Sequence, residues 1–136
     1  MSDTEIAKYT DRLMRRVHAA LHGQAHVFDT QKVGPIGGMV LLTLADAETL
    51  KINDLVKRLA RDKSQVTRLV QTLETKGLIQ RTNDEDDARV VRLALTPLGE
   101  TTVVELQQAF ADALREILSP LSAQEQATLQ DLLSRL

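Results

Sequence analysis

The fold is decided by residues 51–77, which read KINDLVKRLARDKSQVTRLVQTLETKG. Apolar residues recur here at steps of three and four, which predicts two short amphipathic helices, over about 51–60 and 63–76. Asp62 opens a capping-box pattern before the second helix, and Gly77 is expected to end that helix in a left-handed conformation. The stripes that face the core consist of Ile52, Leu55, Val56 and Leu59, then Val66, Leu69, Val70 and Leu73.

Two strand patterns follow the second helix. Residues 78–82 and 90–95 have strand-like composition, and a polar loop over 83–89 joins them, so a hairpin with a long tip is expected. Two helices, a turn and a hairpin in this order are typical of a winged helix-turn-helix, whose second helix enters the major groove of DNA. The sequence therefore predicts a mainly α fold with a small β-hairpin wing.

Helical patterns also flank this central region. They span about 4–23, 36–46, 97–118 and 122–136. Thr96 and Ser122 are the expected N-caps of the last two helices, and Pro97 suits the first helical position. The breaker Gly34-Pro35 is expected to close the connection over 24–34.

The charge of the chain is uneven. Its formal net charge is −2, yet residues 51–81 contain eight Lys and Arg against three Asp and Glu, a local charge of +5. Because salt screens charges over roughly 8–10 Å, this basic segment and not the total charge would meet a phosphate backbone.

Composition excludes several classes of function. The chain has no cysteine, so disulfides, thiol redox sensing and cysteine-ligated zinc are ruled out. No apolar run reaches the roughly 18 residues that span a bilayer, and the polar N-terminus differs from a secretory signal. We expect a cytoplasmic protein without membrane contact. No nucleophile–base pair, phosphate loop or zinc-protease motif is present, so we expect no enzyme activity.

The polar face of helix 63–76 is the candidate DNA-binding site. Side chains of Ser, Gln, Thr and Arg can bond base edges, and Lys at the helix ends can reach phosphates. Arg89 is placed to enter the minor groove from the wing. The alternatives are a solvated polar face on the helix and a structural ion pair between Arg89 and Asp87. The candidate residues are Lys63, Ser64, Gln65, Thr67, Arg68, Gln71, Lys76 and Arg89.

This region resembles the MarR (multiple antibiotic resistance regulator) family. The matching stretches are LVKRL at 55–59, DKSQVTRLV at 62–70, GLI at 77–79, and DAR at 87–89 followed by Leu95-Thr96 and Gly99. The resemblance implies a bacterial dimeric regulator. In it, Ser64, Gln65, Thr67 and Arg68 take recognition-helix positions and Arg89 takes the position of the wing-tip arginine.

The same resemblance implies that one domain over 1–136 contains a DNA-binding part and a dimerisation part. A winged helix-turn-helix lobe would span about 36–95, and a helical dimerisation region about 4–23 and 97–136. The apolar stripes on these end helices also favour a homodimer. We therefore expect a dimeric, ligand-responsive repressor on a pseudo-palindromic operator. The effector would be a small aromatic or amphipathic ligand, and no other cofactor is expected. The alternative is a winged-helix protein–protein interaction module without DNA binding.

The wing departs from this expectation, because Asp84, Glu85, Asp86 and Asp87 are consecutive and only Arg89 opposes them in the loop. Four carboxylates beside DNA phosphates should repel, although partners in the fold could neutralise some of them. The hypothesis is a wing that anchors weakly. Replacing Asp84 and Glu85 by Ser should then tighten DNA binding.

The three histidines, His18, His22 and His26, stand at steps of four. Residues at i and i+4 of a helix can reach one metal ion, which makes His18 and His22 weak candidates for metal binding or pH sensing. Gly23 is expected to interrupt the helix before His26. Surface or partly buried histidines without such a role are the favoured interpretation.

Overall fold

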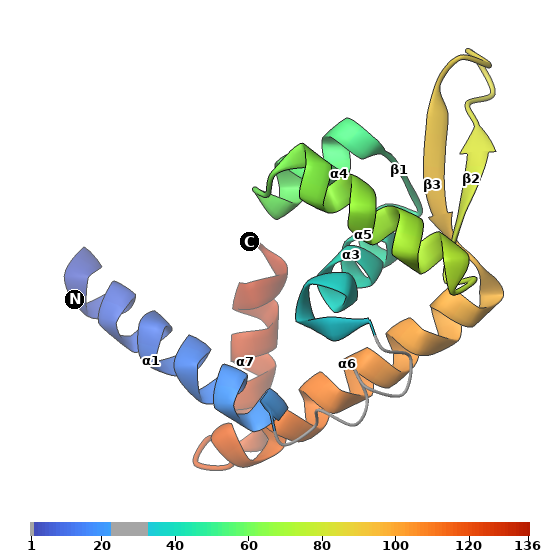
Figure 1. The fold of residues 1–136 in the computed structure, drawn as a ribbon. Coiled ribbons are helices and arrows are strands. Elements are labelled where there is room, and N and C mark those ends of the chain that lie inside the picture. Colours follow the sequence, from blue (N-terminus) through green and yellow to red (C-terminus); the bar gives the residue numbers. More distant parts are fainter. Residues whose placement is uncertain (1, 23–32) are drawn as a thin grey trace. The chain divides into compact units, whose positions relative to one another are not determined.

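The computed structural model describes residues 2–22 and 33–136 of the chain (Figure 1). The chain forms two compact units, one made of Met1–Ala25 with Gln108–Leu136 and the other of His26–Gln107. The elements in chain order are α1 (Asp3–His22), α3 (Gly34–Ala47), β1 (Thr49–Lys51), α4 (Ile52–Leu59), α5 (Lys63–Thr75), β2 (Ile79–Asn83), β3 (Val91–Leu95), α6 (Pro97–Ile117) and α7 (Ala123–Ser134).

A three-stranded antiparallel sheet in the order β1-β3-β2 lies in the unit His26–Gln107. In β3, Leu93 pairs with Leu50 of β1 on one side and with Arg81 of β2 on the other. Strands β2 and β3 form the predicted hairpin, which projects from the helices of its unit (Figure 1). Strand β1 was not predicted, and α4 begins at Ile52 because Lys51 is its N-cap in extended conformation.

The core of this unit is aliphatic. Of the predicted core-facing residues of α4, Leu55 and Leu59 are buried, while Ile52 and Val56 are half-buried and pack against the core. Three of the four predicted core-facing residues of α5 are buried. Leu69 is the exception on α5 and is half-buried. The fully enclosed side chains are Val40, Leu41, Leu44, Leu55, Val66, Val70, Leu73, Leu78, Leu93, Leu106 and Thr102.

The two ends of α5 differ from each other. The capping box predicted at Asp62 does not form, because this N-cap makes no side-chain bond to the helix backbone and accepts a hydrogen bond from the Ser64 hydroxyl instead. At the other end, Gly77 has φ +75° as predicted. The Leu78 amide donates to the Leu73 carbonyl at 3.0 Å and the Gly77 amide to the Glu74 carbonyl at 2.9 Å, which is a Schellman motif.

Helix α3 starts earlier than predicted. It begins at Gly34, with Val33 as N-cap and Pro35 in the first turn, so Gly34-Pro35 opens the helix and does not lie outside it. A proline in the first turn loses no helical hydrogen bond, which is why the pair is compatible with a helix. The expected connection over 24–34 lies outside the described residues up to residue 32.

The unit of α1, α7 and the second half of α6 exposes much apolar surface. Neither α1 nor α7 has a buried residue, and Ile6 and Leu133 are 52% and 56% exposed. The predicted capping box of α7 is confirmed, with Ser122 and Glu125 bonding each other's backbone amides at 2.8 and 3.1 Å. Among the described helices none is long and apolar enough to cross a membrane.

Candidate nucleic-acid interface

The turn between α4 and α5 sets the direction of the candidate recognition helix. Ala60 caps α4 in the left-handed region, with φ 51°, and its amide donates to the Lys57 carbonyl at 3.3 Å. A single left-handed residue reverses the chain sharply after the last helical turn. Helix α5 can therefore pack Val66 and Val70 against the core while its opposite side faces solvent.

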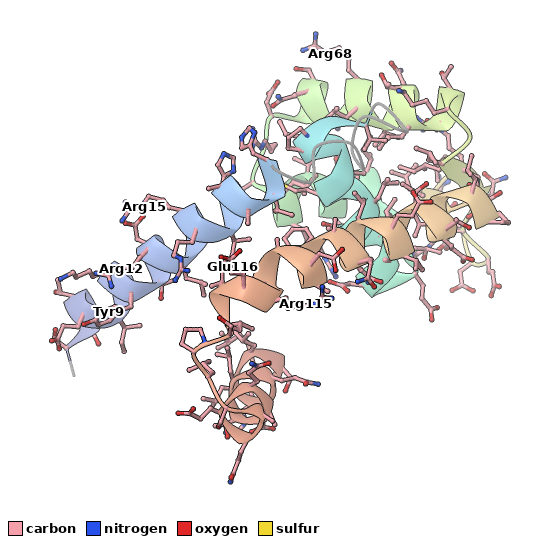
Figure 2. All side chains as sticks on the ribbon, turned by 90° about the horizontal axis from the view of Figure 1, so that it is seen from below. Tyr9, Arg12, Arg15, Arg68, Arg115 and Glu116 are labelled. Carbon is pink, nitrogen blue, oxygen red and sulfur yellow. The ribbon has the colours of Figure 1, made fainter. Side chains whose placement is uncertain are left out.

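Most of the polar face of α5 is exposed. Lys63, Ser64, Arg68 and Gln71 are exposed, whereas Gln65 and Thr67 are half-buried. Figure 2 shows the Arg68 side chain projecting away from the other helices of its unit. In the part of the chain that the structure describes, Arg68 forms no ion pair. Its five N–H donors are therefore available to a ligand outside the protein.

Two hydroxyl groups of this face are already engaged. The Ser64 hydroxyl donates to the Asp62 carboxylate, and the Thr67 hydroxyl donates to the Lys63 carbonyl at 2.8 Å. Each oxygen can still accept a bond, but its proton is in use. Among the described residues of this face, the side-chain donors that remain available are the amides of Gln65 and Gln71 and the guanidinium of Arg68.

The remaining basic groups of the segment are distributed around the two helices. Lys57, Arg58 and Arg61 are exposed beside the turn. Lys76 is half-buried as the C-cap of α5. Arg81 differs, because its guanidinium bonds the Glu74 carboxylate at 2.9 Å, so it links β2 to α5 and adds little net positive charge.

A shallow cleft that the sequence analysis did not predict borders the same face. Its volume is about 300 Å³, and it lies between α3 and α5. Ile36 and Leu69 provide apolar surface beside Gln65 and Arg68. An apolar contact next to hydrogen-bonding groups suits a thymine methyl beside a base edge.

At the wing, Arg89 forms the ion pair with Asp87 that was the alternative to a minor-groove contact. Its guanidinium bonds Asp87 at 3.2 and 3.3 Å, yet 92% of the side chain is exposed. The hydrogen bond from Arg89 holds the pKa of the Asp87 carboxyl below its ordinary value. The ion pair therefore orients Arg89 without covering it.

Asp84 has a structural role that sequence reasoning missed. One carboxylate oxygen accepts from Arg92 at 2.6 Å, and the other accepts from the amides of Asp86 and Asp87 at 3.2 and 3.1 Å. Arg92 also donates to Thr49 of β1 at 3.3 Å. The bond from Arg92 lowers the pKa of Asp84.

These contacts change the expectation for the acidic wing. Asp84 is only 17% exposed in its side chain and holds the loop in shape, so replacing it by Ser would disturb the wing itself. Glu85 and Asp86 are exposed and remain the carboxylates that would face a phosphate. The Asp84–Arg92 pair could have been predicted from the register of the hairpin, because Arg92 lies opposite Thr82, two residues before Asp84.

The comparisons with known proteins match this region. The sequence profile of the MarR family matches residues 38–91, which contain the two helices and most of the wing. A solved structure of a probable transcriptional regulator from Pseudomonas aeruginosa is 33% identical, with 87% of this chain and 91% of that chain covered and a TM-score of 0.57. The chain belongs to the MarR family.

Other relatives of this MarR-family chain carry more specific descriptions. The transcriptional repressor MdtR of Bacillus subtilis is 29% identical over 87% of this chain and 81% of its own length. A MepR mutant from S. aureus, solved bound to an oligodeoxyribonucleotide, is 25% identical with a TM-score of 0.67 and covers 95% of this chain and 94% of that one. The chain spans 59% of the length of YdgJ, a B. subtilis regulator that is 30% identical over 71% of this chain.

The structure gives a physical reason for Gly99, which belongs to the MarR-like pattern after the wing. A Cβ atom at this position would lie 2.1 Å from the Leu78 carbonyl oxygen, which also accepts from the Thr96 amide at 3.1 Å. The Thr96 hydroxyl accepts from the Gly99 amide at 3.0 Å and so caps α6 as predicted. Glycine is therefore required where α6 crosses the start of β2.

The histidine candidates are only partly brought together. His18 and His22 lie on α1 with ring centroids 4.8 Å apart, and His26 lies outside the described residues. Residues 2–22 and 33–136 hold no group of three or more His, Asp or Glu that could surround a metal ion.

Proposed function

We propose that this MarR-family protein is a sequence-specific DNA-binding transcriptional regulator that acts as a homodimer in the cytoplasm. The observation that carries the proposal is the exposed polar face of α5, with Arg68 projecting outward from a helix whose other side is locked into the core (Figure 2). A helix fixed on one side and free on the other can enter the major groove without rearrangement.

The residues of this interface have different roles in the proposal. Arg68, Gln65 and Gln71 read base edges, because bidentate contacts from Arg and Gln discriminate between bases. Lys63 and Lys76 contact phosphates, as do the exposed cations beside the turn. Arg89, held by Asp87, enters the minor groove. Ser64 and Thr67 serve as acceptors or position their neighbours.

Two relatives support regulation by DNA binding. The MepR mutant was solved with an oligodeoxyribonucleotide, and MdtR is described as a transcriptional repressor. These relatives are regulators and not enzymes, so we propose no catalytic activity for this chain. A repressor is the favoured form of the regulator.

The exposed apolar residues of α1 and α7 support the homodimer. A chain of 15.1 kDa that leaves Ile6, Leu132 and Leu133 at least half exposed gains stability by covering them. A second copy of the same chain is the occupant we propose. A dimer would place two recognition helices in successive major grooves, roughly 34–36 Å apart on a pseudo-palindromic operator.

A cleft of about 410 Å³ in the unit His26–Gln107 supports a response to a small aromatic or amphipathic ligand. An apolar floor with two flanking carboxylates would bury the body of such a ligand and orient a polar group. Such a ligand changes DNA binding only if it binds two conformations of the regulator with different affinities. The lining residues are Leu44, Ala45, Glu48, Ala94, Leu95, Glu100 and Val103.

The proposal is tested by selecting DNA from a random pool with the full-length protein and measuring affinity for the selected sequence at several salt concentrations. We expect binding to the selected DNA to be at least about 10³-fold tighter than to scrambled DNA. The logarithm of the binding constant should fall linearly with the logarithm of the salt concentration. Equal affinity for both DNAs would reject sequence-specific recognition. Absence of binding to either would favour the protein–protein interaction module.

A further inference from the structure

Two imidazoles share one exposed side of α1 near its end. The rings of His18 and His22 have centroids 4.8 Å apart with their planes at 81°, and both residues are exposed. We propose that His18 and His22 form a bidentate site for a divalent first-row transition metal, with Cu²⁺ bound more tightly than Ni²⁺ or Zn²⁺. The site does not rest on DNA binding, but it requires that the homodimer proposed through α1 and α7 leaves the end of α1 uncovered.

The spacing satisfies the geometric requirement for chelation. Residues four apart on a helix project to the same side, one turn above the other. Metal–imidazole bonds are about 2.0–2.1 Å long, so the two ligating nitrogens must approach to roughly 3 Å. Because neither side chain is buried, both can reach this separation by rotating about their own bonds without moving the backbone.

The electrostatic surroundings permit a cation. His22 is the last residue of α1, where the carbonyl end of a helix carries partial negative charge. On the same side of α1, Arg15 lies three residues before His18. Its guanidinium is paired with the Asp11 carboxylate at 2.9 Å, which offsets part of its charge.

The number of ligands decides the kind of metal. With two protein ligands, water must complete the coordination, because the described residues offer no third His or carboxylate around the same point. Structural zinc prefers four protein ligands in a tetrahedron, whereas Cu²⁺ accepts two adjacent imidazoles and waters in a tetragonal arrangement. Affinity for divalent metals of this row also peaks at Cu²⁺.

Metal binding should have a local structural consequence. A metal that joins His18 to His22 closes one helical turn, and that turn is held by packing only through the half-buried Val17, Ala20 and Leu21. Occupancy should therefore slow amide hydrogen exchange at the end of α1. Cu²⁺ held elsewhere on the surface would not protect these amides.

The test uses the metal-free full-length protein, titrated with CuCl₂, NiCl₂ and ZnCl₂ by calorimetry, with hydrogen exchange followed at saturation. We expect one Cu²⁺ per chain and slower exchange around residues 18–22. Either H18N or H22N should weaken Cu²⁺ binding by about tenfold or more, because each removes one arm of the chelate. The matched control H26N, which removes the remaining histidine, should retain the affinity.

Three results would overturn the site. They are unchanged Cu²⁺ affinity in H18N and H22N, an equal loss in H26N, and binding that leaves exchange at the end of α1 unaltered. Circular dichroism of each variant, with helix content equal to that of the parent, separates loss of a ligand from loss of the fold.

Discussion

At the residue scale, the junction between the wing and α6 depends on Gly99. Its Cα lies against the Leu78 carbonyl, and the space for a methyl group is occupied by backbone. This contact could not be predicted from the sequence, because it joins residues 21 positions apart across the whole wing. The sequence pattern marked the glycine, and the structure supplies the physical reason for it.

G99A should therefore lower the free energy of unfolding by about 2–3 kcal/mol, as expected when an added atom forces backbone to shift. Urea denaturation measures the change. The control T101A, at an exposed position of the same helix, should change the stability by less than about 0.5 kcal/mol. A G99A protein as stable as the control would contradict the close approach.

The Asp84–Arg92 pair predicts a dependence of stability on pH. Because Arg92 lowers the pKa of Asp84 from its ordinary 3.8, this contribution is complete above that value and is lost as the pH falls through the lower pKa of the folded state. D84N removes the contribution. The difference in unfolding free energy between the parent and D84N should therefore shrink below about pH 4.

Denaturant titrations of both proteins between pH 7 and pH 2.5 measure this difference. D86N is the matched control, since the Asp86 side chain is exposed in the same loop. A difference between parent and D84N that stays constant down to pH 2.5 would show that the pair does not stabilise the fold.

At the element scale, long periodic segments were predictable and short ones were not. The apolar residues of α5 fix its orientation, so its polar face follows from the 3.6-residue period alone. Strand β1 has three residues, too few for alternation to be visible, and exists because Leu50 pairs with Leu93. The prediction of a capping box at Asp62 was wrong for a local reason, because the Asp62 carboxylate accepts a hydrogen bond from the Ser64 hydroxyl.

The wing is the element whose charge most affects the proposed DNA binding. Replacing both Glu85 and Asp86 by Ser removes two exposed carboxylates and leaves the Asp84 and Asp87 contacts intact. We expect DNA affinity to rise about fivefold at low salt, with a steeper dependence on salt, because like charges no longer repel the phosphates. Fluorescence anisotropy measures both quantities.

The control for the wing variant removes the same charge from α6, in E105S combined with E116S. Its affinity for DNA should stay within about twofold of the parent. If the wing variant binds DNA no more tightly than this control, the acidic wing does not weaken anchoring.

At the scale of the whole molecule, the dimer rests on the apolar residues of α1 and α7. L133D places a charge among them, and we expect the dissociation constant of the dimer to rise at least about tenfold. Sedimentation velocity at micromolar concentration measures it, with Q124D as the matched charge at a polar position of α7. A parent protein that sediments as a single 15.1 kDa chain would refute the homodimer.

If the outer face of α5 reads DNA, substitution of Arg68 should weaken binding to the operator. Affinity for the selected operator is measured by anisotropy for the parent, R68A and R115A, the last removing an exposed arginine from α6 (Figure 2). We expect R68A to lose about 1–3 kcal/mol of binding free energy, with relaxed sequence preference, and R115A to bind as the parent does. Equal affinities of R68A and the parent would contradict DNA recognition by this face.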